Sequence, residues 1–269
     1  MKTLLLCLFL VVVHSAPHWK PRLQILDGNI IGGFPAYEGE FPYQLSLQDI
    51  SFGFHFHFCG AVIYNENWGI SAAQCFQGED VEDPSNIIAV AGELEIDLIE
   101  GHEQTIALSH FIQHEDFDGY RRSNDIAVMK MSKTLTFNEF VKPVSLPPAN
   151  HTATGDCIIS GWGTTTEGGI SSKVLMKATL PIITDKACRV VYGESLEDTM
   201  ICAGLPEGGV GGCTADTGGP MVCYDVESPL DSPYLAGIMS WSHGCARPGI
   251  PSVYCEVSHY VDWIESHIS

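Results

Sequence analysis

The chain has 269 residues, of which 33 are acidic and 13 basic, so its formal charge at neutral pH is −20. Such a surface repels phosphate backbones and anionic lipid, so we expect neither nucleic acid nor a membrane as partner, whereas cationic partners, calcium or simple solubility fit better. The 45% hydrophobic content is enough for a well-filled core, and the length suits one large all-β domain or two small ones.

The N-terminus predicts a leader that is removed. Lys2 precedes an apolar run, Leu4–Val13, which is too short to span a bilayer, and no later stretch is long enough either. Small residues precede Ala16, so we expect residues 1–15 to be a signal peptide cleaved near Ser15–Ala16, and the protein to be secreted and extracellular. A buried N-terminal strand is the alternative. Residues 16–29 are polar and aperiodic, and resemble a propeptide.

Short strand-like runs follow one another through the rest of the chain. They cover residues 42–48, 59–65, 86–92, 103–114, 125–131, 157–163, 177–183, 234–241 and 251–257. Clusters of Gly, Pro, Asn and Asp separate them, which is typical of an all-β sandwich or barrel. Only the C-terminal stretch "HYVDWIESHI" is predicted to be helical, because Tyr260, Ile264 and Ile268 recur at every fourth residue.

The ten cysteines indicate disulfides. Cys7 lies in the predicted signal peptide, so nine remain in the mature chain. An oxidising compartment favours disulfides, and an odd number leaves at least one thiol unpaired or paired between chains. Zinc is disfavoured because the chain has no CxxC pair.

Five motifs stand in a recognisable order: "IIGG", "SAAQC", "NDIAVMK", "CTADTGGPMVC" and "SWSHGCARPG". From Ile30 to the C-terminus the chain resembles the chymotrypsin/trypsin family of serine proteases. Within that family it is most similar to crustacean digestive trypsins, through stretches such as "FHFCGA" and "MICAGLPEGG". The resemblance implies one domain over residues 30–269. Its two antiparallel β-barrels would pack side by side and divide near Pro147, with a C-terminal helix and the active-site cleft between the barrels.

The resemblance also implies where a catalytic triad would lie, and two of its three positions differ. Asp125 matches the aspartate, Gln74 stands at the histidine position and Thr217 at the serine position. A carboxamide does not protonate near neutral pH, so Gln74 cannot serve as a general base. The Thr217 alcohol is a weak nucleophile without a base beside it. Rescue by another histidine, such as His57, is disfavoured.

The implied substrate pocket is altered as well. Gly211 stands where trypsins carry the aspartate that binds Lys or Arg, and Ser242 and Ser252 replace two glycines of the pocket walls. Ala215 replaces the glycine whose N–H contributes to the oxyanion hole, and its Cβ narrows the allowed backbone dihedrals.

These substitutions predict a secreted serine protease homologue that is catalytically inactive, a pseudoprotease rather than an enzyme, which acts by binding an unidentified protein. The alternative is a trypsin-like serine endopeptidase with residual or retuned activity that uses Thr217. A third interpretation is a structural or decoy role, such as occupying protease inhibitors.

Activation in this family follows from a cut that frees an amine. The resemblance implies that Ile30 would supply the amine and Asp216 the carboxylate that pairs with it. Asn29 precedes Ile30, and the nearest basic residue is Arg22, so tryptic activation is not expected. Either another protease cuts here or the chain stays uncut.

The resemblance finally implies structural sites. It pairs Cys59 with Cys75, Cys157 with Cys223, Cys188 with Cys202 and Cys213 with Cys245, and leaves Cys255 as a buried thiol or an intermolecular bond. No cofactor is required. A structural calcium ion is expected on the side chains of Glu93, Glu100 and Glu103 and the carbonyl groups of Glu95 and Leu98, unless this is only an acidic solvated loop. Asn150 in "NHT" is a glycosylation sequon.

Overall fold

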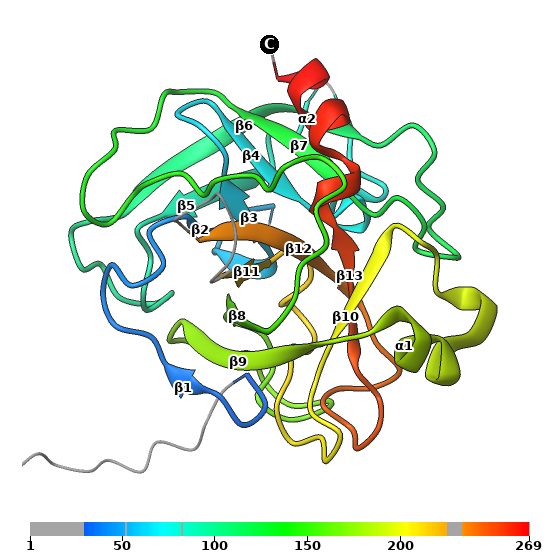
Figure 1. Ribbon diagram of the computed structural model, residues 1–269. Helices are drawn as coiled ribbons and strands as arrows, with labels where there is room; N and C mark the ends of the chain where they lie inside the picture. Colours follow the sequence, from blue (N-terminus) through cyan, green and yellow to red (C-terminus); the bar gives the residue numbers. More distant parts are fainter. Residues whose placement is uncertain (1–29, 52, 82, 225–232, 269) are drawn as a thin grey trace, which may run out of the picture.

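Two antiparallel β-barrels lie side by side in the computed structural model, which describes residues 30–51, 53–81, 83–224 and 233–268 (Figure 1). The predicted signal peptide and propeptide-like segment, residues 1–29, lie outside the described residues. The prediction of an all-β fold of two barrels with a C-terminal helix is confirmed.

The first barrel closes in the order β2-β3-β4-β7-β6-β5. Its strands are β2 (Gln44–Asp49), β3 (Phe56–Ile63), β4 (Trp68–Ser71), β5 (Ile87–Ala91), β6 (Gln104–Gln113) and β7 (Ala127–Met131). Alternation is clearest in β6, where exposed and buried residues follow one another, whereas β4 and β5 are buried throughout. Strands that are covered on both faces carry continuous apolar runs, which is why their sequences do not alternate.

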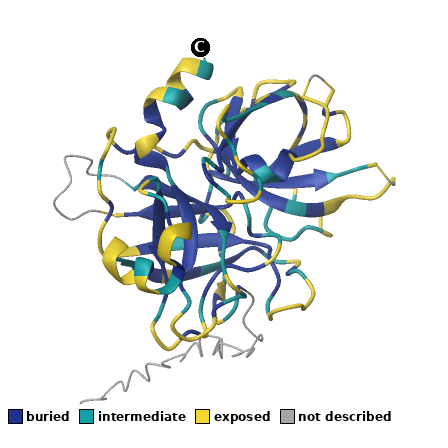
Figure 2. Ribbon diagram, turned by 90° about the vertical axis from the view of Figure 1, so that its right-hand side faces the viewer, coloured by how far each residue is buried: buried dark blue, intermediate teal, exposed yellow. Residues whose placement is uncertain are grey.

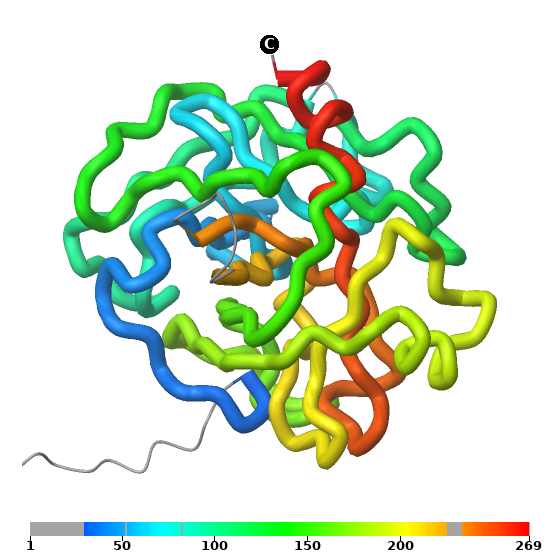
Figure 3. The backbone as a smooth tube through the Cα atoms, viewed as in Figure 1, coloured from blue at the N-terminus to red at the C-terminus, as the bar shows by residue number. Residues whose placement is uncertain are grey.

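The second barrel is a sheet in the order β1-β9-β10-β13-β12-β11-β8, and it closes because β9 also pairs with β8. Its strands are β8 (Asp156–Gly161), β9 (Met176–Ile183), β10 (Met200–Ala203), β11 (Pro220–Cys223), β12 (Tyr234–Trp241) and β13 (Ser252–Glu256), and the short β1 (Phe34–Pro35) pairs with β9. A segment without long strands, residues 132–155, leads from the first barrel to the second (Figure 3). Pro147, the predicted division, lies within it.

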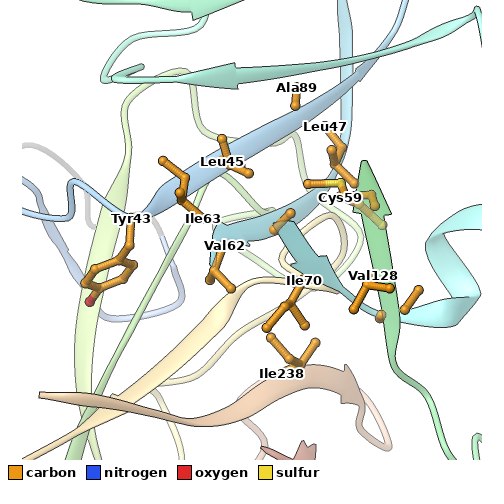
Figure 4. Close-up of a cluster of buried hydrophobic side chains, with 14 of the residues drawn as sticks. Tyr43, Leu45, Leu47, Cys59, Val62, Ile63, Ile70, Ala89, Val128 and Ile238 are labelled. Carbon is orange, nitrogen blue, oxygen red and sulfur yellow. The ribbon is translucent and has the colours of Figure 1, made fainter. Parts of the chain in front are cut away.

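The hydrophobic core runs across both barrels, and exposed residues are confined largely to loops and helices (Figure 2). Leu45, Val62 and Ile70 of the first barrel belong to the same buried cluster as Ile238 of β12 (Figure 4). The C-terminal helix α2 (Val261–His267) adds the fully buried Ile264 to this cluster. Because burial of apolar surface holds the barrels together, residues from both can be fixed against one another in a shared site.

The expectation that only the C-terminus is helical is wrong, because α1 (Asp185–Tyr192) is a helix of eight residues. Thr184 caps it by accepting a hydrogen bond from the Ala187 N–H at 3.4 Å, and a disulfide joins Cys188 to Cys202 of β10. A helix this short is only marginally stable by itself, so the cap and the disulfide stabilise it. Its sequence is too short to show a long helical repeat of apolar residues, which is why it was not predicted. Three short 3-10 turns are also present: η1 (Ala73–Phe76), η2 (Gly193–Ser195) and η3 (Val257–His259).

Four disulfides join Cys59–Cys75, Cys157–Cys223, Cys188–Cys202 and Cys213–Cys245, the pairs that the resemblance implies. Cys255 is free and buried, and burial raises the pKa of its thiol. A thiol kept protonated in this way is a poor nucleophile. In the described part of the chain, no helix is long and apolar enough to cross a membrane.

Candidate active site

Gln74 and Asp125 are brought together at the edge of the first barrel, although 51 positions separate them in the chain. Turn η1, which follows β4, presents Gln74, and Asp125 lies two residues before β7. The Gln74 backbone N–H donates to Asp125 Oδ1 at 2.8 Å, and the Gln74 side-chain amide donates to Asp125 Oδ2. Both residues therefore stand as one hydrogen-bonded unit.

Ser240 of β12 completes this unit from the second barrel. Its hydroxyl donates to Asp125 Oδ2 at 2.5 Å, and its carbonyl accepts from Gln74 Nε2 at 2.8 Å. Burial raises the pKa of Asp125, which is 1% exposed, and the hydrogen bonds from Ser240 and Gln74 oppose that rise. Sequence reasoning did not single out Ser240; its place in "SWSHG" was the available signal.

The two acceptors fix the orientation of the Gln74 amide. Only the NH₂ group can donate to both the Asp125 carboxylate and the Ser240 carbonyl, so the carbonyl oxygen Oε1 lies on the opposite side of the amide. Oε1 remains available as a hydrogen-bond acceptor. An amide oxygen accepts a hydrogen bond well but holds a proton poorly, so it can orient a hydroxyl without deprotonating it.

Thr217 lies in the loop between Cys213 and β11. Its carbonyl accepts from the Gly60 N–H of β3 at 2.8 Å, which ties the loop to the first barrel. Within the described ranges, the Thr217 hydroxyl takes part in no hydrogen bond, and neither the Thr217 N–H nor the Ala215 N–H donates one. Two unbonded backbone donors beside a free hydroxyl can stabilise negative charge that develops on a carbonyl oxygen under attack.

Ala215 has a left-handed backbone, with φ +72, which a residue with a Cβ adopts at a cost of about 1–2 kcal/mol. His57 supports this conformation. Its Nε2 is 3.1 Å from the Ala215 carbonyl oxygen and its Nδ1 is 2.8 Å from Ser46 Oγ. Burial lowers the pKa of His57 to about 4, so the ring is neutral near pH 7 and donates through Nε2 while Nδ1 accepts from Ser46. His57 thus holds the loop rather than serving as a replacement base.

Asp216 is buried between Ile30 and the Thr217 loop. A cavity of about 10 Å³ is lined by Ile30, Asp216, Gly212 and six other residues. The Asp216 carboxylate accepts from the N–H groups of Gly163 at 2.8 Å and Cys213 at 2.9 Å. Burial raises its pKa to about 6, and those two bonds lower it only in part. No cationic side chain within the described residues pairs with it.

The predicted pocket residues also meet in the second barrel. A Cβ built on Gly211 would lie 3.6 Å from Ser252 Oγ and 3.4 Å from the Ala246 Cβ. Ser242 Oγ lies 3.5 Å from the Pro251 carbonyl oxygen, one residue before Ser252. Gly211 thus lies near Ser252, and Ser242 near Pro251, so these three positions carry two hydroxyl groups and no carboxylate.

The acidic loop 93–103 fits calcium only in part. Carboxylate oxygens suit this ion, and burial together with the charges of Glu103 and Glu100 raises the pKa of Glu93 to about 7. Yet the Glu103 carboxylate already accepts backbone N–H bonds from Glu100 and Gly101. In the described part of the chain, no three His, Cys, Asp or Glu side chains are grouped closely enough to hold a metal ion. Glu95 and Leu98 are linked by a backbone hydrogen bond from Leu98 N to Glu95 O.

Comparison with known proteins places this geometry in a family. The Trypsin family profile matches residues 30–264. The chain is similar to Trypsin-1 of Astacus astacus, with 54% identity over 88% of this chain and 99% of the relative. It is also similar to Trypsin of Sus scrofa, with 38% identity over 90% of this chain and 97% of the relative, and to Anionic trypsin of Bos taurus, with 37% identity over 90% and 91%.

These comparisons contradict the prediction that the chain is not an enzyme, because the relatives that match most of its length are named trypsins. That prediction rested on the substitutions at the triad, oxyanion-hole and pocket positions. Thr217 keeps a hydroxyl, Asp125 keeps its partners, and the backbone donors stay unbonded in the described residues. The protein therefore belongs to the trypsin family of serine proteases.

Proposed function

We propose that the chain is a secreted serine-type endopeptidase with residual or retuned activity, in which the Thr217 hydroxyl attacks the scissile peptide carbonyl. The observation that carries this proposal is the pair of unbonded N–H groups, at Ala215 and Thr217, beside a hydroxyl that is itself free within the described ranges. Such donors stabilise the tetrahedral oxyanion, and this stabilisation supplies a large share of the rate enhancement in acyl transfer.

Gln74 and Asp125 then act as positioning residues. Asp125 and Ser240 hold the Gln74 amide and leave its Oε1 free. We infer that Oε1 accepts a hydrogen bond from the Thr217 hydroxyl once a substrate is bound, a bond that the described residues do not form before binding. Attack forms an ester on Thr217 and breaks the peptide C–N bond, and a water molecule then hydrolyses the ester. No side chain at the site with a pKa near neutral takes the hydroxyl proton, so solvent water carries it to the nitrogen of the leaving amine, and the rate stays far below that of a complete triad. Serine proteases with a disabled triad retain about 10³–10⁴-fold catalysis over water from the oxyanion hole and binding, and we expect activity of that order.

The predicted pocket next to the scissile bond should accept a different substrate side chain from the Lys or Arg that trypsins bind. Gly211 places no carboxylate in the pocket, so a Lys or Arg side chain finds no counter-charge there. Ser242 and Ser252 add hydroxyl groups to the predicted pocket and no charge, and we infer that such a pocket suits a small, uncharged side chain. We therefore expect cleavage after small residues rather than after basic ones.

The test compares turnover with a matched blank. The chain is cut before Ile30 and incubated with a broad peptide library, alongside Thr217→Ala prepared in the same way. We expect turnover above the Thr217→Ala rate, mostly after small residues. Equal rates for the two proteins on every peptide would overturn the proposal.

Activation is proposed through Ile30 and Asp216. A cut between Asn29 and Ile30 would free an ammonium group at the wall of the cavity that holds the Asp216 carboxylate. Pairing would neutralise a buried charge and fix the Thr217 loop. A protease that cleaves after Asn is required, since Asn29 is not a tryptic site.

Secretion, glycosylation and calcium binding remain proposals with separate support. The four disulfides suit an oxidising compartment, and Asn150 is exposed at a turn where its backbone N–H is bonded to the Ser258 carbonyl. A calcium ion at loop 93–103 would relieve the like charges around Glu93, and its role would be structural.

A further inference from the structure

A cavity of about 580 Å³ opens beside the candidate active site, and among its lining residues only Ser242 belongs to the predicted substrate pocket. Three segments form its walls: the loop Tyr120–Arg122, the stretch after α1 with Glu194, Ser195 and Glu197, and the end of β12 with Trp241, Ser242 and His243. The first segment belongs to the first barrel and the other two to the second. A volume of this order holds several residues of an extended peptide.

Residues of the cavity wall lie next to the Gln74–Asp125–Ser240 unit along the chain. Trp241 directly follows Ser240, whose carbonyl and hydroxyl bond Gln74 and Asp125. On the opposite wall, Arg122 stands three residues before Asp125, and its charge lowers the pKa of Asp125, after the larger effects of burial and hydrogen bonding. A peptide that reaches Thr217 can therefore extend along this wall.

Arg121 and Arg122 are the unusual residues of the cavity. The other two arginines in the described part of the chain, Arg189 and Arg247, form ion pairs with Asp198 and Glu167. Arg121 and Arg122 form no ion pair and no side-chain hydrogen bond among the described residues, although the chain carries 33 acidic side chains. The Arg121 charge reaches only the exposed Asp118, whose carboxylate is bonded to backbone N–H groups.

The loop that carries the arginines is held in place before any ligand binds. Asp118 Oδ1 accepts from the N–H groups of Tyr120 at 2.9 Å and Arg121 at 3.2 Å, and the Arg122 N–H donates to the Asp118 carbonyl at 2.7 Å. Arg122 has φ +61, a left-handed backbone that a non-glycine residue adopts only where surrounding contacts impose it. Such strained residues cluster at ligand sites, and Arg122 is one of the residues that line the cavity.

Glu194 and Glu197 also line the cavity, so it carries two acidic side chains beside the two arginines. Glu197 Oε1 already accepts a hydrogen bond from Ser123 Oγ, so part of its capacity is used within the protein. Trp241 and Tyr192 form an edge-to-face pair with ring centroids 4.8 Å apart, which gives a rigid aromatic floor. Against a chain of charge −20, the arginine pair is a local positive spot that selects negative side chains.

We propose that this cavity binds acidic residues of a peptide, with Arg121 and Arg122 pairing with Glu or Asp side chains of the segment that lies along Trp241. That these acidic peptides are substrates rests on the proposed endopeptidase function. That the cavity binds them does not depend on it. The two arginines are specificity-determining residues, and they take no part in the chemical step.

The experiment measures binding in the Thr217→Ala background, where no turnover disturbs the equilibrium. Fluorescently labelled peptides of one sequence carry paired Glu, paired Gln or paired Lys, and their dissociation constants are read by anisotropy. Arg121→Gln and Arg122→Gln are compared with Lys133→Gln, which removes an exposed positive charge outside the cavity walls. An unfolding curve for each variant checks that it is folded.

We expect the Glu peptide to bind most tightly, and each arginine substitution to weaken it about fivefold while leaving the Gln peptide unchanged. Lys133→Gln should change the dissociation constant of neither peptide by more than about twofold, which is the effect expected from the change in net charge alone. Arg122→Lys should recover part of the loss. Equal binding of the three peptides, or tightest binding of the Lys peptide, would overturn the proposal; the latter would assign the site to Glu194 and Glu197.

Binding and turnover separate this inference from the proposed function. If the chain prefers acidic peptides in binding but its turnover does not exceed the Thr217→Ala rate, the endopeptidase proposal is rejected and the acidic binding site is supported. If turnover is present without any acidic preference, the acidic site is rejected and the endopeptidase proposal is supported. If Arg122→Gln fails to fold, Arg121→Gln, which removes an exposed side chain from an ordinary backbone position, still decides the question.

Discussion

At the scale of single residues, Gln74 forms the hydrogen bonds that hold the candidate site together but cannot accept a proton. Its amide satisfies Asp125 and the Ser240 carbonyl together, so no buried acceptor is left without a donor. What an amide lacks is a lone pair basic enough to deprotonate Thr217. The candidate site thus keeps its hydrogen bonds, and we expect its chemistry to be slow.

Restoring the imidazole should restore the rate. Gln74→His combined with Thr217→Ser supplies a base with a pKa near neutral, oriented by Asp125, so we expect kcat/KM to rise about 10²–10⁴-fold on peptides that the unmodified chain cleaves. Initial rates on those peptides are the measurement. Gln74→Asn with Thr217→Ser, which keeps an amide, is the control and should show no comparable gain. A double variant no faster than the starting chain would mean that the loop or the pocket, rather than the base, limits activity.

Ala215 offers a test of backbone strain. Ala215→Gly removes the Cβ from a residue with φ +72, so the free energy of unfolding should rise by about 1 kcal/mol. The matched control is Ala187→Gly in the exposed helix α1, where the same change should lower it by about 1 kcal/mol. Urea denaturation measures both. A loss of stability at both positions would show that the surrounding loop, and not the Cβ, sets the strain.

At the scale of elements, the start of the described chain is anchored on the second barrel next to the catalytic loop. Ile31 forms an isolated antiparallel bridge with Gly211, and Ile30 is 1% exposed beside the Asp216 carboxylate. The segment that precedes β1 is therefore joined directly to the loop that carries Thr217. A change of charge at Ile30 reaches the active site through one shared cavity.

Cleavage before Ile30 should change the pH dependence of stability. In the uncut chain the pKa of Asp216 is about 6, above its unfolded value of about 3.9, so the folded state holds a proton that the unfolded state has lost. The contribution of Asp216 to stability therefore falls as the pH rises from about 4 to about 6, and stays low above that. In the cut chain the new ammonium group lowers this pKa, so the fall should shrink or reverse.

Thermal unfolding of cut and uncut chains between about pH 4 and pH 7 is the measurement. Uncut Asp216→Asn serves as control, because it lacks this titration and should show a smaller fall across the same window. Superimposable pH profiles for cut and uncut chains would exclude a pairing between Ile30 and Asp216.

At the scale of the whole molecule, some carboxyl groups have a raised pKa and stay protonated at a higher pH than usual. They therefore contribute less negative charge than the sequence alone suggests. Burial and the charges of Glu103 and Glu100 raise the pKa of Glu93 to about 7, so its contribution to stability falls as the pH rises from about 4.5 to about 7. A bound cation would reverse this effect, because it favours the ionised form.

Calcium should therefore raise the melting temperature more at pH 8 than at pH 5. At a calcium concentration of a hundred times Kd the gain in the free energy of unfolding would be about 2.7 kcal/mol. Glu93→Gln should remove most of this gain, whereas Glu79→Gln, which changes an exposed carboxylate outside the loop, should not. Magnesium, which demands stricter geometry, should give a smaller shift. The same calcium shift in Glu93→Gln would exclude a site at loop 93–103.

The sequence by itself determined the class of fold and the chemistry available at each position. Short apolar runs with clusters of turn residues between them predicted the strands, because this signal is local. The ordered motifs predicted the two barrels and the disulfide partners, because the family shares them. Residue type alone also established that Gln74 is no base and that Gly211 carries no charge.

Only the tertiary structure decided which distant residues meet. The bonds from Ser240 to Asp125 and from His57 to the Ala215 carbonyl span 115 and 158 positions, and the cavity of Arg121 and Arg122 takes walls from both barrels. Helix α1 likewise depends on the bond between Cys188 and Cys202. Such contacts arise when barrels close and share a core, and no local pattern of side chains records where that packing will bring two loops together.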